Sequence, residues 1–62
     1  MTTIELRKII KSILEAQGGK FYGFNYNNLR AAYNVSGTQI QNAYNYFKYS
    51  PQQKKFRETW GL

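Results

Sequence analysis

Residues 34–47, NVSGTQIQNAYNYF, combine side-chain amides, hydroxyls and phenols with almost no charge, although the 62-residue chain has a formal net charge of +6. A carboxamide donates and accepts hydrogen bonds at the same time, so Asn or Gln can pair with the N6 and N7 atoms of adenine. Apolar residues recur between the amides at helical spacing. The stretch is therefore either a core helix with an unused polar surface or a helix whose amides recognise a partner.

The composition excludes most kinds of catalytic and metal site. The chain has no Cys and no His, which removes disulfides, thiol catalysis and the usual zinc ligand sets. Its only acids are Glu5, Glu15 and Glu58, and three scattered Glu residues give no basis for a paired-carboxylate site. The usual general acid–base and nucleophile arrangements are also missing. We therefore expect a protein that is not an enzyme and that needs no cofactor or metal.

The excess of positive charge favours a polyanionic partner. Nine Lys and Arg residues stand against three Glu residues, which makes nucleic acid the first choice. No run of about 18 apolar residues is present, and the N-terminal MTTIELRK does not look like a signal peptide. We expect one domain over residues 1–62, a cytoplasmic location and no membrane partner. The size and composition also suit a protein encoded by a phage, a virus or a mobile element.

Capping signals and periodicity predict a first helix over residues 2–17. Thr2 and Glu5 have the spacing of a capping box, in which each side chain satisfies a free backbone N–H. Gly18 and Gly19 end the helix, because glycine adopts the left-handed C-cap conformation at little cost. One face carries an apolar stripe for the core, consisting of Leu6, Ile9, Ile10, Ile13 and Leu14.

Two further helices are expected after a short aromatic connection, KFYGF, which is either a strand or a packed loop. Asn25 is the expected N-cap of a second helix over residues 26–33. Ser36 and Gln39 have capping-box spacing and open a third helix over residues 37–49.

The tail SPQQKKFRETWGL has two interpretations. Ser50 and Pro51 stop the third helix and resemble the start of a short C-terminal helix, with proline at its first position. Alternatively, residues 54–60 form a strand that pairs with residues 20–24, as in the small two-stranded sheet of a winged helix. We favour the helix, because its capping signal is the more specific pattern. The expected fold class is mainly α.

Apolar spacing connects the second and third helices. Five positions are separated by four, two, five and three residues, as expected where two helices cross around a short turn and bury their contact positions. The turn needs one residue with positive φ, and Asn34 is the best choice after glycine. The five positions are Leu29, Tyr33, Val35, Ile40 and Ala43.

Residues 26–46 therefore resemble the helix-turn-helix superfamily of DNA-binding domains. With the first helix as a packing partner, the resemblance extends to a three-helix helix-turn-helix core, to which the short C-terminal helix is added. One position departs from the pattern, because Arg30 stands where such motifs usually keep a small residue. Its long side chain must point outward or tilt the helices.

The resemblance implies that the third helix is the recognition helix and lies in the major groove of double-stranded DNA. At about 100° per residue, its core face consists of Ile40, Ala43, Tyr44 and Phe47. The opposite, base-reading face consists of Thr38, Asn42, Asn45 and Tyr49, flanked by Gln39, Gln41 and Tyr46. Phosphate contacts, which give affinity and register, are expected from Arg30, Lys48, Lys54, Lys55 and Arg57.

A different class of function fits the same residues. Exposed Tyr side chains among amides are also typical of protein-binding surfaces, such as that of a small inhibitor docking on a larger host protein. A single helix-turn-helix unit usually needs a second copy or a neighbour for adequate affinity, so a homodimer is a further hypothesis. The cations of the first helix, which we expect on a solvated face, are Arg7, Lys8 and Lys11.

Overall fold

The computed structural model describes all 62 residues, which form helices and no strand. The elements are α1 (Thr3–Ala16), α2 (Gly23–Tyr33), α3 (Gly37–Tyr49), the short 3-10 helix η1 (Pro51–Gln53) and α4 (Lys54–Trp60). The predicted mainly α fold with a short C-terminal helix is confirmed. The winged-helix alternative is wrong, because residues 54–60 are helical and the connection after α1 leads directly into α2.

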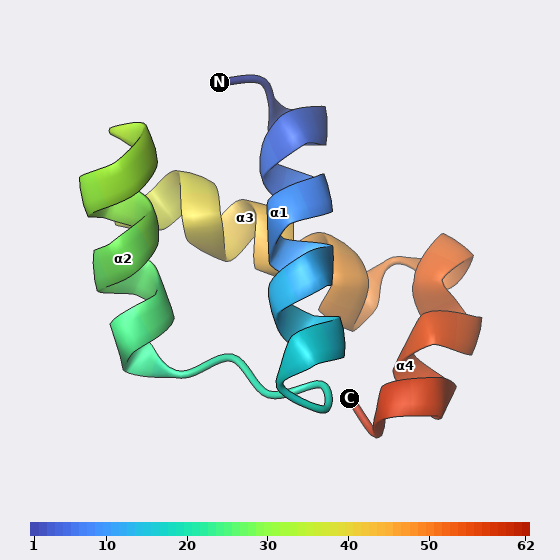
Figure 1. Ribbon diagram of the computed structural model, residues 1–62. Helices are drawn as coiled ribbons and strands as arrows, with labels where there is room; N and C mark the ends of the chain where they lie inside the picture. The colour runs from blue at the N-terminus through green and yellow to red at the C-terminus, as the bar shows by residue number, and fades with distance from the viewer.

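The arrangement of the helices is that of a three-helix core with one appendage. Helices α1 and α2 run in opposite directions, and α3 crosses behind both of them (Figure 1). Helix α3 packs on α1, on α2 and on α4, so it is the element that joins the others. No helix is long and apolar enough to cross a membrane.

Both predicted capping boxes are present and explain where α1 and α3 begin. Glu5 N–H donates to Thr2 Oγ1 at 3.1 Å, and Thr2 N–H donates to Glu5 Oε1 at 3.1 Å. At α3, Gln39 N–H donates to Ser36 Oγ at 3.1 Å and Ser36 N–H donates to Gln39 Oε1 at 2.8 Å. The backbone N–H of Thr2 holds the pKa of Glu5 below its ordinary value. The stabilisation from this carboxylate is therefore present near neutral pH and is lost as the pH falls through that lowered pKa.

The predicted start of the second helix is wrong by three residues. Helix α2 begins at Gly23 with Tyr22 as N-cap, and Asn25 lies within its first turn, 5% exposed. Asn25 Oδ1 accepts from Tyr22 N–H at 2.8 Å and from Gln17 Nε2 at 3.0 Å, and Asn25 Nδ2 donates to Gln17 Oε1 at 3.2 Å. Asn25 therefore caps α2 from inside the helix and fastens it to the end of α1.

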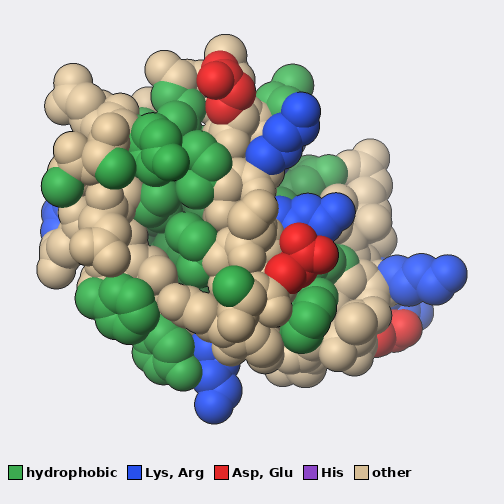
Figure 2. All heavy atoms as spheres, viewed as in Figure 1, with side chains coloured by type: hydrophobic (Ala, Val, Ile, Leu, Met, Phe, Trp, Pro, Cys, Tyr) green, Lys and Arg blue, Asp and Glu red, His purple; other side chains and the backbone are tan.

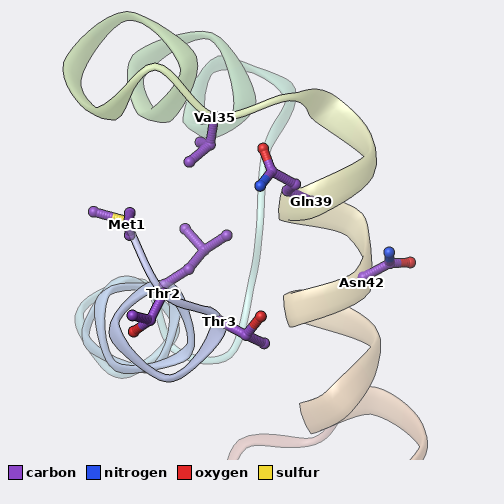
Figure 3. Close-up of a pocket in the computed structure, with 7 residues that line it drawn as sticks. Met1, Thr2, Thr3, Val35, Gln39 and Asn42 are labelled. Atoms are coloured by element: carbon purple, nitrogen blue, oxygen red, sulfur yellow. The ribbon is translucent and has the colours of Figure 1, made fainter.

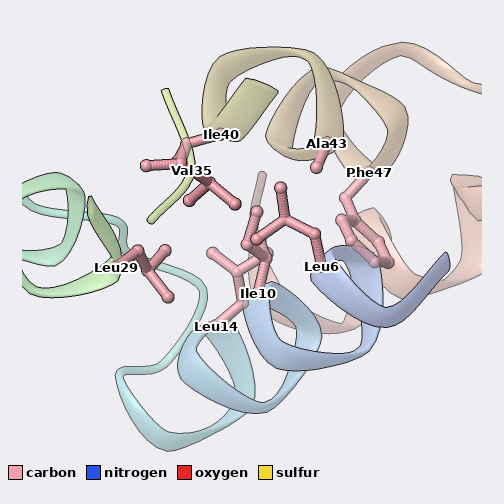
Figure 4. Packing of buried hydrophobic residues seen from close by; sticks show 8 residues of the cluster. All are labelled: Leu6, Ile10, Leu14, Leu29, Val35, Ile40, Ala43 and Phe47. Atoms are coloured by element: carbon pink, nitrogen blue, oxygen red, sulfur yellow. The ribbon is translucent and has the colours of Figure 1, made fainter. Parts of the chain in front are cut away.

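The core lies where α1, α2 and α3 meet (Figure 4). Its eight buried residues are Leu6, Ile10 and Leu14 of α1, Leu29 of α2, Val35 of the turn, and Ile40, Ala43 and Phe47 of α3. Ile9 and Ile13, also predicted for this stripe, are only half-buried at its edge. Tyr33 was predicted to be in the core and is instead 42% exposed, because it is the last residue of α2 and lies beyond the crossing with α3.

The turn between α2 and α3 has the predicted conformation. Asn34 adopts φ 53 and ψ 41, in the left-handed region, and its N–H donates to the carbonyl of Arg30. Val35 follows and is buried between the helices. The Arg30 side chain points outward, donates from Nη2 to Asn27 Oδ1 at 2.5 Å, and lies beside Gly37 at the start of α3. The long side chain is thus accommodated outside the helix crossing.

Helix α4 folds back onto the rest of the molecule. The Phe56 ring lies 5.4 Å from the Phe47 ring, and Gly61 ends the helix in the left-handed conformation. The end of α4 reaches the turn after α1, where a Cβ on Gly19 would lie 2.5 Å from the carbonyl oxygen of Trp60. Only glycine fits there, and its φ of +88° favours glycine independently.

Candidate nucleic-acid interface

The surface of α3 that faces away from the core carries the predicted polar side chains. Thr38, Asn42 and Tyr49 are exposed, and Asn45 beside them is half-buried. Successive side chains along a helix are rotated by about 100°. These four side chains therefore lie on the side of α3 opposite the buried Ile40. The predicted division of α3 into an apolar face and an uncharged polar face is confirmed; whether the polar face binds DNA stays a prediction.

Asn42 is the amide of this face that remains free. It is exposed and takes no part in the hydrogen bonds that engage Gln39 and Gln41. It borders a hollow of about 100 Å³ between α3 and the first turn of α1, which Gln39 also lines. Figure 3 shows the Asn42 amide directed away from α1 and the Gln39 side chain turned toward the hollow. Because Gln39 Oε1 completes the capping box, Asn42 is better placed to offer a donor and an acceptor together.

Gln41 and Asn45 belong to a hydrogen-bonded chain that starts on α2. The Tyr26 hydroxyl donates to Gln41 Oε1 at 2.5 Å, and Gln41 Nε2 donates to Asn45 Oδ1 at 2.8 Å. Partial burial, with Tyr44 nearby, raises the pKa of Tyr26 above its ordinary value. No pattern in the sequence signals this contact between Tyr26 and an amide fifteen residues later.

Tyr46 does not lie free at the edge of the base-reading face, as the sequence predicted. It is half-buried between α3 and α1, where the Arg7 guanidinium carbon lies 3.9 Å from the ring centroid. Its hydroxyl accepts from Gln53 Nε2 at 3.2 Å and donates to Gln52 Oε1 at 3.3 Å. Arg7, expected on a solvated face, therefore stacks on α3, and its Nε is buried without a hydrogen-bond partner. These contacts arise from the crossing of α1 and α3, which spacing along one helix does not reveal.

The predicted phosphate-binding cations divide into free and engaged side chains. Lys54 and Lys55 are exposed in the first turn of α4. Lys48 is exposed on α3, with its Nζ 5.6 Å from the Tyr49 ring centroid. Arg57 is half-buried, and its Nη1 donates to the carbonyls of Phe47 at 2.9 Å and Ser50 at 2.6 Å. Arg57 thus satisfies the Phe47 carbonyl at the end of α3, which faces Pro51 and has no intrahelical partner, and it adds a second donor to the Ser50 carbonyl, which already accepts from Gln53 N–H at 3.0 Å.

Replacing Arg57 with Ala is expected to lower the free energy of unfolding by about 1 to 3 kcal/mol, since the two lost hydrogen bonds come from a charged donor. Urea unfolding followed by circular dichroism measures this difference. Lys55→Ala removes a cation from the same helix where the side chain is exposed, and it should leave the stability nearly unchanged. Equal effects of the two replacements would contradict the helix-ending role of Arg57.

Comparisons of the chain with protein-family models, with curated proteins and with solved structures found no match. The residues themselves contain no group of acidic side chains that could hold a metal ion. The site consists of an uncharged amide face on α3, with the exposed Arg30 beside the start of this helix and the exposed Lys48 near its end.

Proposed function

We propose that this protein is a small DNA-binding protein that reads the major groove with the exposed face of α3. It would act as a transcriptional regulator or an architectural accessory factor. The observation that carries the proposal is the free amide of Asn42, which lies within the first two turns after the Ser36 cap, on a helix whose start is fixed by the left-handed turn at Asn34. The first turns of a recognition helix lie nearest to the bases.

The distribution of charge supports the same proposal. Base contacts give specificity and phosphate contacts give affinity, so a reading face needs hydrogen-bonding groups and its borders need cations. Thr38 and Asn42 offer uncharged donors and acceptors. Arg30 lies beside the start of α3 and Lys48 lies near its end, and in this proposal they would meet the phosphates on either side of the groove.

Selection from a random library of DNA duplexes tests DNA binding and the target site together. We expect a preferred site to be recovered, and we expect affinity to weaken steeply as the salt concentration rises, because bound phosphates release counterions. A gel-shift titration at several salt concentrations measures the slope. Absence of any binding at low salt would overturn the proposal. A sedimentation measurement with and without the selected site would show whether the protein binds as a homodimer.

Replacing Lys54 and Lys55 together with Gln is expected to reduce the slope of log affinity against log salt by about 2, since each phosphate contact contributes about 0.9. Preference for the selected site over a scrambled one should be unchanged, because these side chains meet the backbone of the DNA. The matched control is Lys8 and Lys11→Gln, which removes the same charge from exposed positions of α1. If both pairs change the slope equally, α4 is not a phosphate contact.

A second candidate function, a protein-interaction module, rests on a different surface. Apolar side chains gather on the face formed by α1 and α2, with cations scattered around its edges (Figure 2). Tyr22 and Phe24 at the start of α2 are exposed and stack on each other at 5.5 Å, and Tyr33 is exposed at its other end. Exposed aromatic groups of this kind are enriched where proteins meet. The absence of DNA binding at low salt would favour this function.

A further inference from the structure

The chain of hydrogen bonds from Tyr26 through Gln41 to Asn45 connects α2 with the polar face of α3. Gln41 is used at both ends of its carboxamide, since Oε1 accepts from one neighbour and Nε2 donates to the other. A carboxamide held at both ends in this way has a fixed orientation, although its oxygen keeps one lone pair and its NH₂ group keeps one hydrogen. Gln41 therefore acts as a connector between the side chains of Tyr26 and Asn45.

The distances fix the direction of the chain. A separation of 2.5 Å between Tyr26 and Gln41 fits an O–H···O hydrogen bond, whereas N–H···O bonds are usually about 2.9 to 3.0 Å long. Gln41 Oε1 must therefore face the hydroxyl, and its Nε2 must face Asn45. Asn45 Oδ1 is the acceptor of that bond, so the Asn45 Nδ2 group is left with its two hydrogens unused within the chain.

Tyr26 is held rigidly enough to set this geometry. Its ring meets Phe21 edge to face at 5.1 Å, and Phe21 stacks on Tyr44 of α3 at 5.1 Å. Edge-to-face and stacked pairs have defined orientations and add stability beyond burial alone. The hydroxyl is consequently anchored by aromatic contacts that do not depend on the amides.

We infer that Tyr26 is a positioning residue for DNA reading: through Gln41 it fixes the Asn45 carboxamide so that Nδ2 presents donors to the base edges. The inference rests on the proposed function and deepens it. A fixed NH₂ group selects bases that carry acceptors in the major groove, which are guanine through N7 and O6, adenine through N7 and thymine through O4, and it disfavours cytosine, which offers only the N4 donor there. Asn45 thus specifies an acceptor-bearing base beside the position that Asn42 reads.

Tyr26→Phe keeps the ring and removes the hydroxyl, so the thermal midpoint should stay close to that of the wild type. Binding to random DNA should be unchanged, while discrimination at one base position should fall by about 3- to 10-fold, the effect of one net hydrogen bond. Tyr33→Phe is the matched control, because this exposed hydroxyl at the other end of α2 is outside the chain of hydrogen bonds. Equal discrimination by the two variants would overturn the inference.

Gln41→Glu tests the direction of the chain. A carboxylate still accepts from Tyr26 but offers no hydrogen to Asn45, so the Asn45 carboxamide must turn and donate inward through Nδ2. Its Oδ1 would then face the bases, and preference at that position should change from guanine or thymine, which present acceptors and no donor, to cytosine, which presents only a donor. The ratio of affinities for the two sites is the measurement, because the added negative charge lowers both affinities. An unchanged ratio would contradict the inference.

The failure of the inference and that of the proposed function are separable. The side-chain NH₂ resonances of Asn45, recorded by NMR without DNA, should shift in Tyr26→Phe and stay in place in Tyr33→Phe. If the wild type selects a site and Tyr26→Phe selects it equally well, the positioning role is wrong and the DNA-binding function stands. If the wild type binds no DNA at low salt, both the proposed function and the reading role of Asn45 are overturned, whatever the resonances show.

Discussion

Replacing Ile40 with Ala is expected to lower the free energy of unfolding by about 2 to 5 kcal/mol, the usual cost of truncating a buried aliphatic side chain. Ile40 is 0% exposed and lies at the junction of α1, α2 and α3. A domain of this length has a total stability of only about 3 to 9 kcal/mol. The variant should therefore be largely unfolded, or its thermal midpoint should fall by more than about 10 °C.

The control for this replacement is Ile4→Ala. Ile4 is 64% exposed in the first turn of α1, so the same change of side chain removes little buried surface. Its thermal midpoint should stay within a few degrees of the wild type. A similar result for Ile40→Ala would show that the crossing of α3 over α1 and α2 is not the centre of the core.

Replacing Asn42 with Ala is expected to remove base discrimination at one position, worth about 1 to 3 kcal/mol or roughly 5- to 150-fold in affinity. Asn42 is exposed and makes no side-chain hydrogen bond within the protein, so its removal should leave the fold intact. Binding to random DNA should persist, because the cations that meet the phosphates are unchanged. Titrations onto the selected site and a scrambled site measure the loss.

Asn28→Ala is the matched control for Asn42. Asn28 is also an exposed asparagine on a helix, but it lies on α2 and away from the polar face of α3. Its replacement should keep the full preference for the selected site. If Asn42→Ala keeps that preference too, α3 does not read bases through this side chain. If Asn42→Ala melts much lower than Asn28→Ala, the amide is structural and the assignment of the polar face is wrong.

The ends of the helices could be predicted wherever the capping or turn residues lie within a few positions of the helix end. The capping boxes at Thr2 and Ser36, the left-handed turn at Asn34 and the helix stop before Pro51 are local hydrogen-bonding or steric effects, and the structure contains all four. The start of α2 could not be predicted in this way. Asn25 looks like an N-cap in isolation, but it lies in the first turn of α2, where it accepts from Tyr22 N–H and contacts Gln17, the C-cap residue of α1.

Burial was predictable for residues at the contact between the helices. Leu29, Ile40 and Ala43 are buried as their spacing indicates, because 3.6-residue periodicity decides which side of a helix is apolar, and Val35 is buried in the turn as expected. Tyr33 has the same periodicity and is exposed, because the point at which α3 crosses α2 decides how far along the helix the core extends. That crossing depends on all three helices together.

The sequence by itself determined which side chains share the outer face of α3, since helical geometry alone turns Thr38, Asn42 and Tyr49 away from Ile40. Only the tertiary structure decided which polar groups near that face are free. Gln41 is engaged by Tyr26 of α2, and Arg57 by carbonyls at the end of α3, although in the sequence both look like exposed polar residues. The physical reason is that a hydrogen bond between elements depends on where two helices meet, and no periodicity within one helix carries that information.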